Sequence, residues 1–231
     1  MNIIERYGVH NKAKYKGRKI EYIVIHYTAG VTSKKGTAQN TALWYLNSAC
    51  VCSSDFVVDD VEVVQYNGDI ENTYTWHCGG EKYSNKGGKL YGVATNINSI
   101  GIEICSTNSS GNMTYPNDPR YSFTNAAIDN TVELVCYLMD KYKIPPENVI
   151  RHYDTTGKVC PGVIGWNDES GDISAWEKFK ERIGAEAPEA NENDYVYVVQ
   201  RIQCAVFKDE DKAKEYSKRT GAEVIRVKCT T

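Results

Sequence analysis

The stretch IEYIVIHYTA, residues 20–29, carries apolar side chains on both faces of an extended chain and is rich in β-branched and aromatic residues. This composition predicts a strand that is buried on both sides in the middle of a sheet. DFVVDD (55–60) and EVVQYNGD (62–69) predict two short strands joined as a hairpin around residues 59–61. ENVIRHYD (147–154), which follows a pair of prolines, predicts a further strand.

A fifth strand is predicted by INSIGIEICS, residues 97–106. Ile100, Ile102 and Ile104 alternate with small or polar residues, and successive side chains of a strand point to opposite faces of the sheet. One face of this strand is therefore apolar, and the other carries the carboxylate of Glu103.

The segments between the strands favour helices. Thr37 can cap a helix over AQNTALWYLNS (38–48), and Thr124 can cap NAAIDNTVELVCYLMDKYK (125–143). ISAWEKFKERIG (173–184) has apolar residues at helical spacing along one face. Strands that alternate with helices indicate an α/β protein with a mixed central β-sheet flanked by helices.

The segment AEAPEANEND, residues 185–194, has no apolar periodicity and contains one proline and four acidic residues, which predicts a linker. It divides the chain into a main domain, 1–184, and a small C-terminal domain, 195–231. The order of the segments in the small domain predicts strand, helix, strand (βαβ). Thirty-seven residues make a thin core, so this domain is expected to pack on a partner or to form a homodimer.

Charge is distributed unevenly between the two parts. Residues 195–231 have a balance of +3, whereas the other 194 residues have a balance of −6. A basic tail on an acidic body favours contact with an anionic surface, and a solvated surface with no such role is the alternative.

The remaining composition indicates where the protein is made and which partners it lacks. The first ten residues, MNIIERYGVH, have no apolar core of a secretory signal, and no run approaches the roughly 20 apolar residues of a membrane span. We expect synthesis in the cytoplasm, no membrane insertion and no nucleic-acid partner. The eight cysteines form no paired CxxC framework, which favours thiols over disulfides in that compartment.

VIRHYDTTGKVCPG, residues 149–162, brings together a histidine, a lysine and a cysteine: His152, Lys158 and Cys160. His26 also ends a predicted buried strand. A catalytic zinc site uses three such nitrogen or sulfur ligands and leaves one position open for water. A buried histidine is more often a core residue with satisfied hydrogen bonds than a ligand, so the spacing alone leaves both interpretations open.

Four motifs, in this order, resemble the type-2 N-acetylmuramoyl-L-alanine amidase family: YIVIHYTAG, TWHCGG, NSIGIEI and HYDTTGKVCPG. This family includes phage endolysins and is related to peptidoglycan recognition proteins, and the similarity covers roughly residues 18–182. The resemblance implies a zinc-dependent hydrolase that cleaves the amide bond between N-acetylmuramic acid and L-alanine in bacterial peptidoglycan. By position it implies that Zn²⁺ is held by His26, His152 and Cys160.

The same resemblance implies the roles of four other residues. Glu103 matches a general base, and Lys158 matches a lysine that stabilises the oxyanion. Trp76 and His77 match a segment that lines the substrate cleft in the family. At the start of the second strand the sequence departs from the family, because Ser54 or Asp55 stands where some members carry tyrosine or histidine.

A phage or prophage endolysin that reaches the wall after release from the host cytoplasm fits an enzyme without a signal segment and with a basic extra domain. A cytoplasmic amidase that recycles soluble muropeptides is an alternative, although such a substrate would not require an anchor on the wall. A non-catalytic peptidoglycan-recognition module is a second alternative, but a pure binding module has no use for the thiolate of Cys160.

Overall fold

The computed structural model describes residues 3–79, 88–184, 195–200, 205–207 and 223–228. The chain divides into two compact units, residues 1–185 and residues 186–231. This boundary falls within the linker predicted from the sequence, 185–194, and that linker lies outside the described residues.

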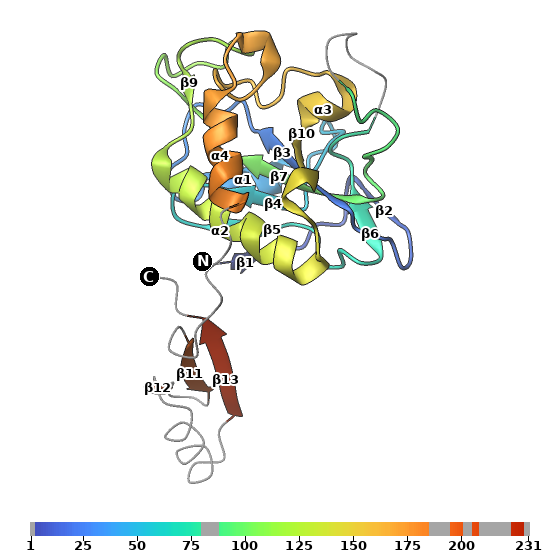
Figure 1. Ribbon diagram of the computed structural model, residues 1–231, viewed down its shortest axis with the longest axis vertical. Helices are drawn as coiled ribbons and strands as arrows, with labels where there is room; N and C mark the ends of the chain where they lie inside the picture. Colours follow the sequence, from blue (N-terminus) through green and yellow to red (C-terminus); the bar gives the residue numbers. More distant parts are fainter. Residues whose placement is uncertain (1–2, 80–87, 185–194, 201–204, 208–222, 229–231) are drawn as a thin grey trace. The chain divides into compact units, whose positions relative to one another are not determined.

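The first unit is built around a six-stranded sheet in the order β1-β5-β4-β7-β3-β10 (Figure 1). The strands are β1 (Ile3–Glu5), β3 (Tyr22–Tyr27), β4 (Phe56–Val58), β5 (Val63–Gln65), β7 (Ser99–Ile104) and β10 (Val149–Arg151). Neighbouring strands are parallel except β4 and β5, which form an antiparallel pair. The sheet is therefore mixed and contains the predicted hairpin, and β3 lies between two parallel neighbours.

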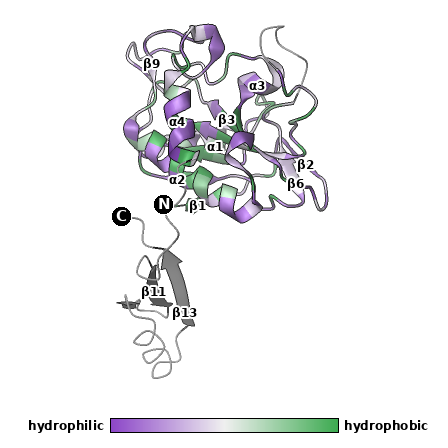
Figure 2. Cartoon of the chain, in the orientation of Figure 1, coloured by the Kyte–Doolittle hydropathy of each residue, from purple (hydrophilic) through white to green (hydrophobic). Residues whose placement is uncertain are grey.

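The apolar residues of β3 explain its position. Ile23, Val24 and Ile25 are fully buried, so both faces of this strand are covered. Hydropathy colouring shows hydrophobic residues on the strands at the centre of the unit and hydrophilic residues toward its surface (Figure 2). A strand with apolar residues on both faces is stable only where both faces are excluded from water.

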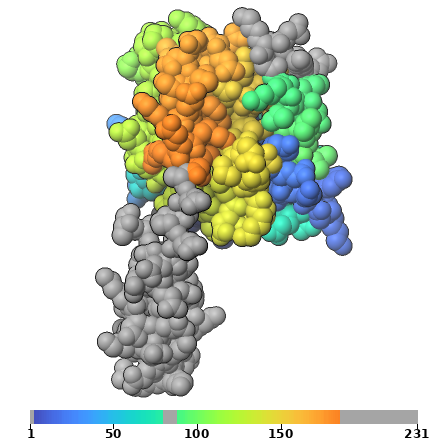
Figure 3. Space-filling view, in the orientation of Figure 1, coloured from blue at the N-terminus to red at the C-terminus, as the bar shows by residue number. Residues whose placement is uncertain are grey.

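Helices cover the two faces of the sheet. The helices α2 (Asn125–Tyr142) and α4 (Ser174–Gly184) contact each other, adjoin on one surface of the unit (Figure 3), and pack on the core that contains Ile23, Ile25 and the isoleucines of β7. The helix α1 (Thr37–Trp44) packs against Val57 and Val64. These valines alternate with Phe56, Val58 and Val63 of the other core, so α1 lies on the opposite face.

Two short antiparallel sheets and three short helical segments complete the first unit. The sheets pair β2 (Lys12–Lys14) with β6 (Thr73–Thr75), and β8 (Thr107–Asn108) with β9 (Tyr121–Ser122). The short helical segments are η1 (Pro146–Asn148), α3 (His152–Thr156) and η2 (Asp168–Ser170). None of the helices in the described ranges is both long enough and apolar enough to cross a membrane.

The two predicted caps have different outcomes. Thr124 caps α2, where its hydroxyl oxygen accepts a hydrogen bond from the Ala127 N–H at 3.1 Å. The predicted cap at Thr37 is wrong, because Gly36 occupies the N-cap position with a φ of 87°, which favours glycine. The carboxylate of Asp59, distant in sequence, accepts from the Ala38 N–H at 3.0 Å and replaces a local cap.

The predicted strand over 147–154 is shorter in the structure. The strand β10 covers only residues 149–151, and His152 is the first residue of α3 rather than the last residue of a strand. The Asp154 carboxylate accepts hydrogen bonds from the backbone N–H and the guanidinium of Arg151, which turns the chain into the helix directly after the strand.

The second unit contains β11 (Tyr195–Gln200), β12 (Ala205–Phe207) and β13 (Glu223–Lys228). They form a three-stranded sheet in the order β12-β11-β13, and both pairs are antiparallel. The predicted order strand, helix, strand therefore lacks one strand, because both β11 and β12 come before β13. The helix predicted between β12 and β13 lies outside the described residues.

Candidate active site

Parallel pairing brings the predicted ligands to one edge of the sheet. Ile25 of β3 is in register with Arg151 of β10, so the next residues, His26 near the end of β3 and His152 at the start of α3, lie at the same edge of the sheet. Their ring centroids are 4.7 Å apart. Carboxyl ends of parallel strands meet at one edge of a sheet, which is where sites collect in α/β folds.

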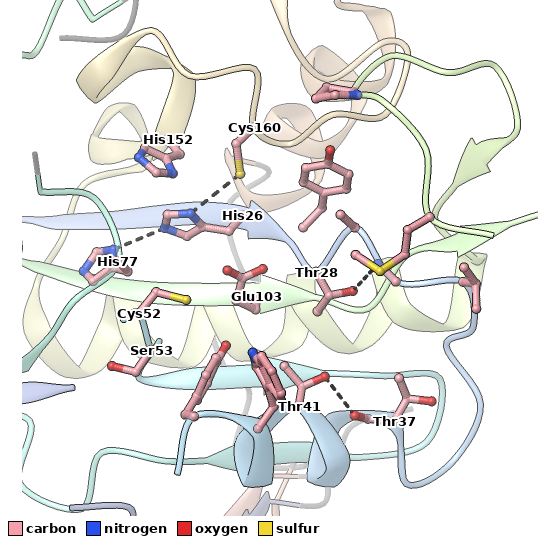
Figure 4. A pocket seen from close by; sticks show the side chains of 18 of the residues that line it. His26, Thr28, Thr37, Thr41, Cys52, Ser53, His77, Glu103, His152 and Cys160 are labelled. Carbon is pink, nitrogen blue, oxygen red and sulfur yellow. Dashed lines mark hydrogen bonds between the residues drawn. The ribbon is translucent and has the colours of Figure 1, made fainter. Parts of the chain in front are cut away.

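The loop after α3 returns Cys160 to these two histidines. The helix ends at Gly157, whose φ of 79° is the left-handed conformation that favours glycine. The chain then turns back, and the Tyr153 N–H donates to the Cys160 carbonyl at 2.9 Å. The Cys160 sulfur consequently lies 3.7 Å from His26 Nδ1 (Figure 4).

The three side chains His26, His152 and Cys160 form a site that fits a metal ion. One ligand atom from each lies within 4.8 Å of the others, and all three residues are buried. Burial lowers the pKa of His26 well below its usual value and lowers that of His152 to about 3, and nearby His and Lys charges add to this, so both imidazoles are neutral. Neutral imidazole is the form that binds metals.

The protonation state of the Cys160 thiol also favours a bound cation. Burial, with a smaller contribution from the Glu103 carboxylate, raises the pKa of Cys160 to about 12 in the absence of metal. A thiol in such a place becomes a thiolate only when a cation binds to it. Imidazole nitrogen and cysteine thiolate are both donors that zinc accepts, and a catalytic zinc site keeps three protein ligands.

Glu103 lies next to this cluster. It is in register with His26 on the neighbouring strand β7, and Figure 4 shows its carboxylate beside that imidazole. Its Oε2 is shielded from solvent and has no hydrogen-bond partner among the residues that the structure describes. Burial raises the pKa of Glu103 to about 8, although the charge of Lys158 opposes the shift.

These residues open into a cleft of about 800 Å³. The exposed side chain of Lys158 lines it together with Glu103 and the three candidate ligands. The opposite wall comes from α1 and the segment after it, which contribute Thr37, Asn40, Thr41, Trp44, Tyr45, Cys52 and Ser53 (Figure 4). The cleft therefore joins the three candidate ligands and Glu103 to the solvent.

Comparisons with known proteins identify the family of this chain. Residues 16–163 match the family model described as N-acetylmuramoyl-L-alanine amidase. The chain belongs to the N-acetylmuramoyl-L-alanine amidase family. It is 30% identical over 187 residues to the N-acetylmuramoyl-L-alanine amidase XlyA of Bacillus subtilis. This alignment covers 80% of this chain and 52% of XlyA. It is 32% identical over 156 residues to CwlH of the same species, covering 67% of this chain and 53% of CwlH.

Solved structures of related proteins show the same fold. The catalytic domain of XlyA aligns with a TM-score of 0.57 and 28% identity, over 80% of this chain and 100% of that domain. A mutant endolysin from Bacillus subtilis aligns with a TM-score of 0.56 and 29% identity, over 79% and 99% of the two chains. The chain spans about half the length of the curated relatives that it matches.

The two predicted substrate contacts, Trp76 and His77, differ in their exposure and in their position relative to the cleft. Trp76 is 43% exposed and is not among the residues that line the cleft, whereas His77 is buried beside His26 and lines it. Ser54 and Asp55, where the sequence departs from some relatives, are fully buried. The Asp55 carboxylate accepts hydrogen bonds from Asn67, Thr75 and Gly101, so it holds the sheet together and does not face the cleft.

Sequence reasoning missed the α1 wall of this amidase-family cleft. The helix was predicted only as a covering element, yet Trp44 is 53% exposed and lines the cleft. The signal that could have indicated this wall was the set of apolar side chains on the outer face of the predicted helix. Exposed apolar patches on a protein surface often mark ligand-binding grooves. The sequence did not indicate that this face would meet the ends of β3 and β7.

Proposed function

We propose that this chain is a zinc-dependent hydrolase that cleaves the amide bond between N-acetylmuramic acid and L-alanine in bacterial peptidoglycan. The observation that carries the proposal is the buried cluster of His26, His152 and Cys160 beside the unpartnered Oε2 of Glu103. A non-catalytic module has no reason to shield a carboxylate oxygen from solvent without a hydrogen-bond partner, because such burial costs stability.

His26, His152 and Cys160 would hold the zinc ion. Bound Zn²⁺ would supply a Lewis acid that polarises the scissile carbonyl and lowers the pKa of water. Glu103 takes the proton of the attacking water on its solvent-shielded carboxylate and delivers it to the leaving nitrogen. In the metal-free protein burial raises the pKa of Glu103 to about 8, and a nearby divalent cation would favour the ionised carboxylate that acts as the base.

Lys158 supplies the second catalytic element. Its exposed position on the loop between Gly157 and Cys160 leaves the ammonium able to turn into the cleft. There it stabilises the negative charge that develops on the carbonyl oxygen as the tetrahedral intermediate forms. Trp76 contacts the substrate outside the cleft, where its exposed ring offers an apolar face to a sugar or a stem peptide.

The biological setting that we propose is a phage or prophage endolysin acting on the cell wall. The likeness to a protein named as an endolysin supports this setting, and the sequence-level charge contrast between the two units supports a wall-binding role for the second. In this proposal the second unit meets an anionic wall polymer, and self-association of that unit is the alternative.

The experiment combines metal content with activity. Purified protein should carry close to one zinc per chain and should reduce the turbidity of purified cell walls. A strong chelator should abolish both the zinc and the lysis, and added Zn²⁺ should restore them. Glu103→Gln serves as the matched control, because it should keep the zinc and lose the lysis. Lysis that persists after verified removal of the metal would contradict the proposal.

A further inference from the structure

A chain of hydrogen bonds runs from His26 into the protein, away from the proposed metal. His26 Nε2 lies 3.1 Å from His77 Nδ1, and His77 Nε2 lies 3.2 Å from the Ser99 hydroxyl oxygen. The Ser99 hydroxyl in turn donates to the Thr95 carbonyl at 2.5 Å. The side chains of His26, His77 and Ser99 are all buried, so water does not compete for these contacts.

The last contact fixes the direction of the others. A carbonyl oxygen can only accept, so the single hydrogen of the Ser99 hydroxyl is used toward Thr95. The Ser99 oxygen must then accept a hydrogen from His77 Nε2. A neutral imidazole carries one hydrogen, so His77 Nδ1 is left as an acceptor.

The same rule then applies to His26. Because His77 Nδ1 is the acceptor of this contact, His26 Nε2 must carry the hydrogen and donate it to His77 Nδ1. His26 Nδ1 is therefore left with a lone pair, and this is the atom that faces the Cys160 sulfur at 3.7 Å. Figure 4 shows the two contacts of His26 on opposite sides of its ring.

We propose that His77 is a positioning residue that sets the tautomer and the ring orientation of His26, so that Nδ1 is the atom that binds the metal. The inference rests on the proposed metal site but concerns a residue outside the ligand set. The sequence predicted a substrate contact for His77, but both ring nitrogens are already engaged with the protein. Partners behind a ligand histidine fix which nitrogen binds the metal and increase its affinity.

The surrounding backbone is shaped to hold the His77 ring. The backbone N–H groups of His77, Cys78 and Gly79 all donate to the side-chain oxygen of Asn96, at 3.1, 2.8 and 3.1 Å. The ring lies over β7 at Gly101, where a Cβ atom would come within 2.5 Å of His77 Cγ. Glycine at this position therefore leaves room for the ring, which explains a small residue in the middle of a buried strand.

The first test compares two substitutions at position 77. In His77→Asn the amide oxygen can take the place of Nδ1 and accept from His26, whereas His77→Leu has no acceptor. Affinity for Zn²⁺ and Co²⁺ is measured on the full chain by competition with a chromophoric chelator. We expect His77→Leu to lose about 10- to 100-fold in affinity and His77→Asn to recover most of it. His10→Leu, which removes an exposed histidine, should bind like the wild type.

The second test reads the tautomer directly in the metal-free wild type. Long-range ¹⁵N–¹H NMR distinguishes a protonated from an unprotonated imidazole nitrogen, and we expect hydrogen on Nε2 of both His26 and His77. Gly101→Ala, which displaces the ring without touching a ligand, should weaken metal binding as His77→Leu does.

The results separate this inference from the proposed function. A protein that binds no zinc at all would overturn the metal site itself. A protein that binds zinc but carries the hydrogen on His26 Nδ1 when metal-free would overturn only the role of His77. Folded His77→Leu with wild-type zinc affinity would do the same. If His77→Leu does not fold, the wild-type NMR result and His77→Asn still decide the question.

Discussion

Replacing Glu103 by glutamine should stabilise the metal-free protein while abolishing its activity. Among the described residues Oε2 of Glu103 has no hydrogen-bond partner, and burial raises the pKa of the carboxyl from the ordinary 4.5 to about 8. Because the folded state binds this proton more tightly than the unfolded state does, the contribution of Glu103 to stability is fully present below about pH 4.5. It is lost progressively as the pH rises to about 8.

The size of the effect follows from the same shift. Each pKa unit corresponds to about 1.4 kcal/mol, so moving a pKa from 4.5 to about 8 corresponds to a ceiling of about 5 kcal/mol. The Glu103 side chain as a whole is partly exposed, and solvent reduces the free-energy cost of ionising its carboxyl in the folded protein. We therefore expect the free energy of unfolding of Glu103→Gln to exceed that of the wild type by about 2 to 4 kcal/mol at pH 8. Near pH 4.5 the two free energies should be equal.

The assay is urea unfolding of chelator-treated protein between pH 4.5 and 9, followed by tryptophan fluorescence. All four tryptophans lie in residues 1–185, so the signal reports on the first unit. Other titrating groups occur in both proteins and cancel in the difference. Bound zinc should reduce the difference in unfolding free energy between the two proteins, because a nearby divalent cation stabilises the ionised carboxylate. Parallel stability curves for the two metal-free proteins across this pH range would refute the reasoning.

Three further predictions concern the metal, the lysine and the second unit. Cys160→Ser should lower zinc affinity by at least about 10-fold in equilibrium binding, since a hydroxyl is a far poorer ligand than a thiolate; unchanged affinity would remove Cys160 from the ligand set. Lys158→Ala should retain zinc and lose about 100-fold or more in kcat, as expected for an oxyanion donor; near-normal turnover would assign that role elsewhere. Deletion after residue 184 should preserve hydrolysis of a small muropeptide but weaken sedimentation with intact walls, and the wall binding of the full chain should decrease with salt. A dimer that becomes a monomer on truncation, with wall affinity per chain unchanged, would instead indicate a dimerisation unit.

Part of the candidate site could be predicted because His26 and Glu103 stand near the ends of predicted strands. The β-branched run before His26 and the glycine-containing loop before Cys160 are local signals, and parallel pairing brings His26 and His152 together. The choice of His26, His152 and Cys160 as candidate ligands came from the resemblance to the amidase family. Alternation along β7 likewise placed Glu103 on the face away from the isoleucine core.

What could not be predicted depends on contacts between distant segments. The N-terminus of α1 is satisfied by Asp59, which lies 21 residues away, so a local capping pattern was misleading at Thr37. The place of His77 behind His26 depends on Ser99 and on the space above Gly101, and neither is visible in the spacing of the motifs. Such contacts follow from the packing of the sheet and not from any single stretch of sequence.

The most direct test of the central claim is the chemistry of the product. Purified peptidoglycan digested with the full chain should show new L-alanine amino termini, measured by labelling of free amines and mass spectrometry of the released stem peptides. No new reducing sugar should appear, because no glycosidic bond is cut. New reducing ends, or new amino termini on any residue other than the L-alanine attached to N-acetylmuramic acid, would contradict the proposed amidase activity.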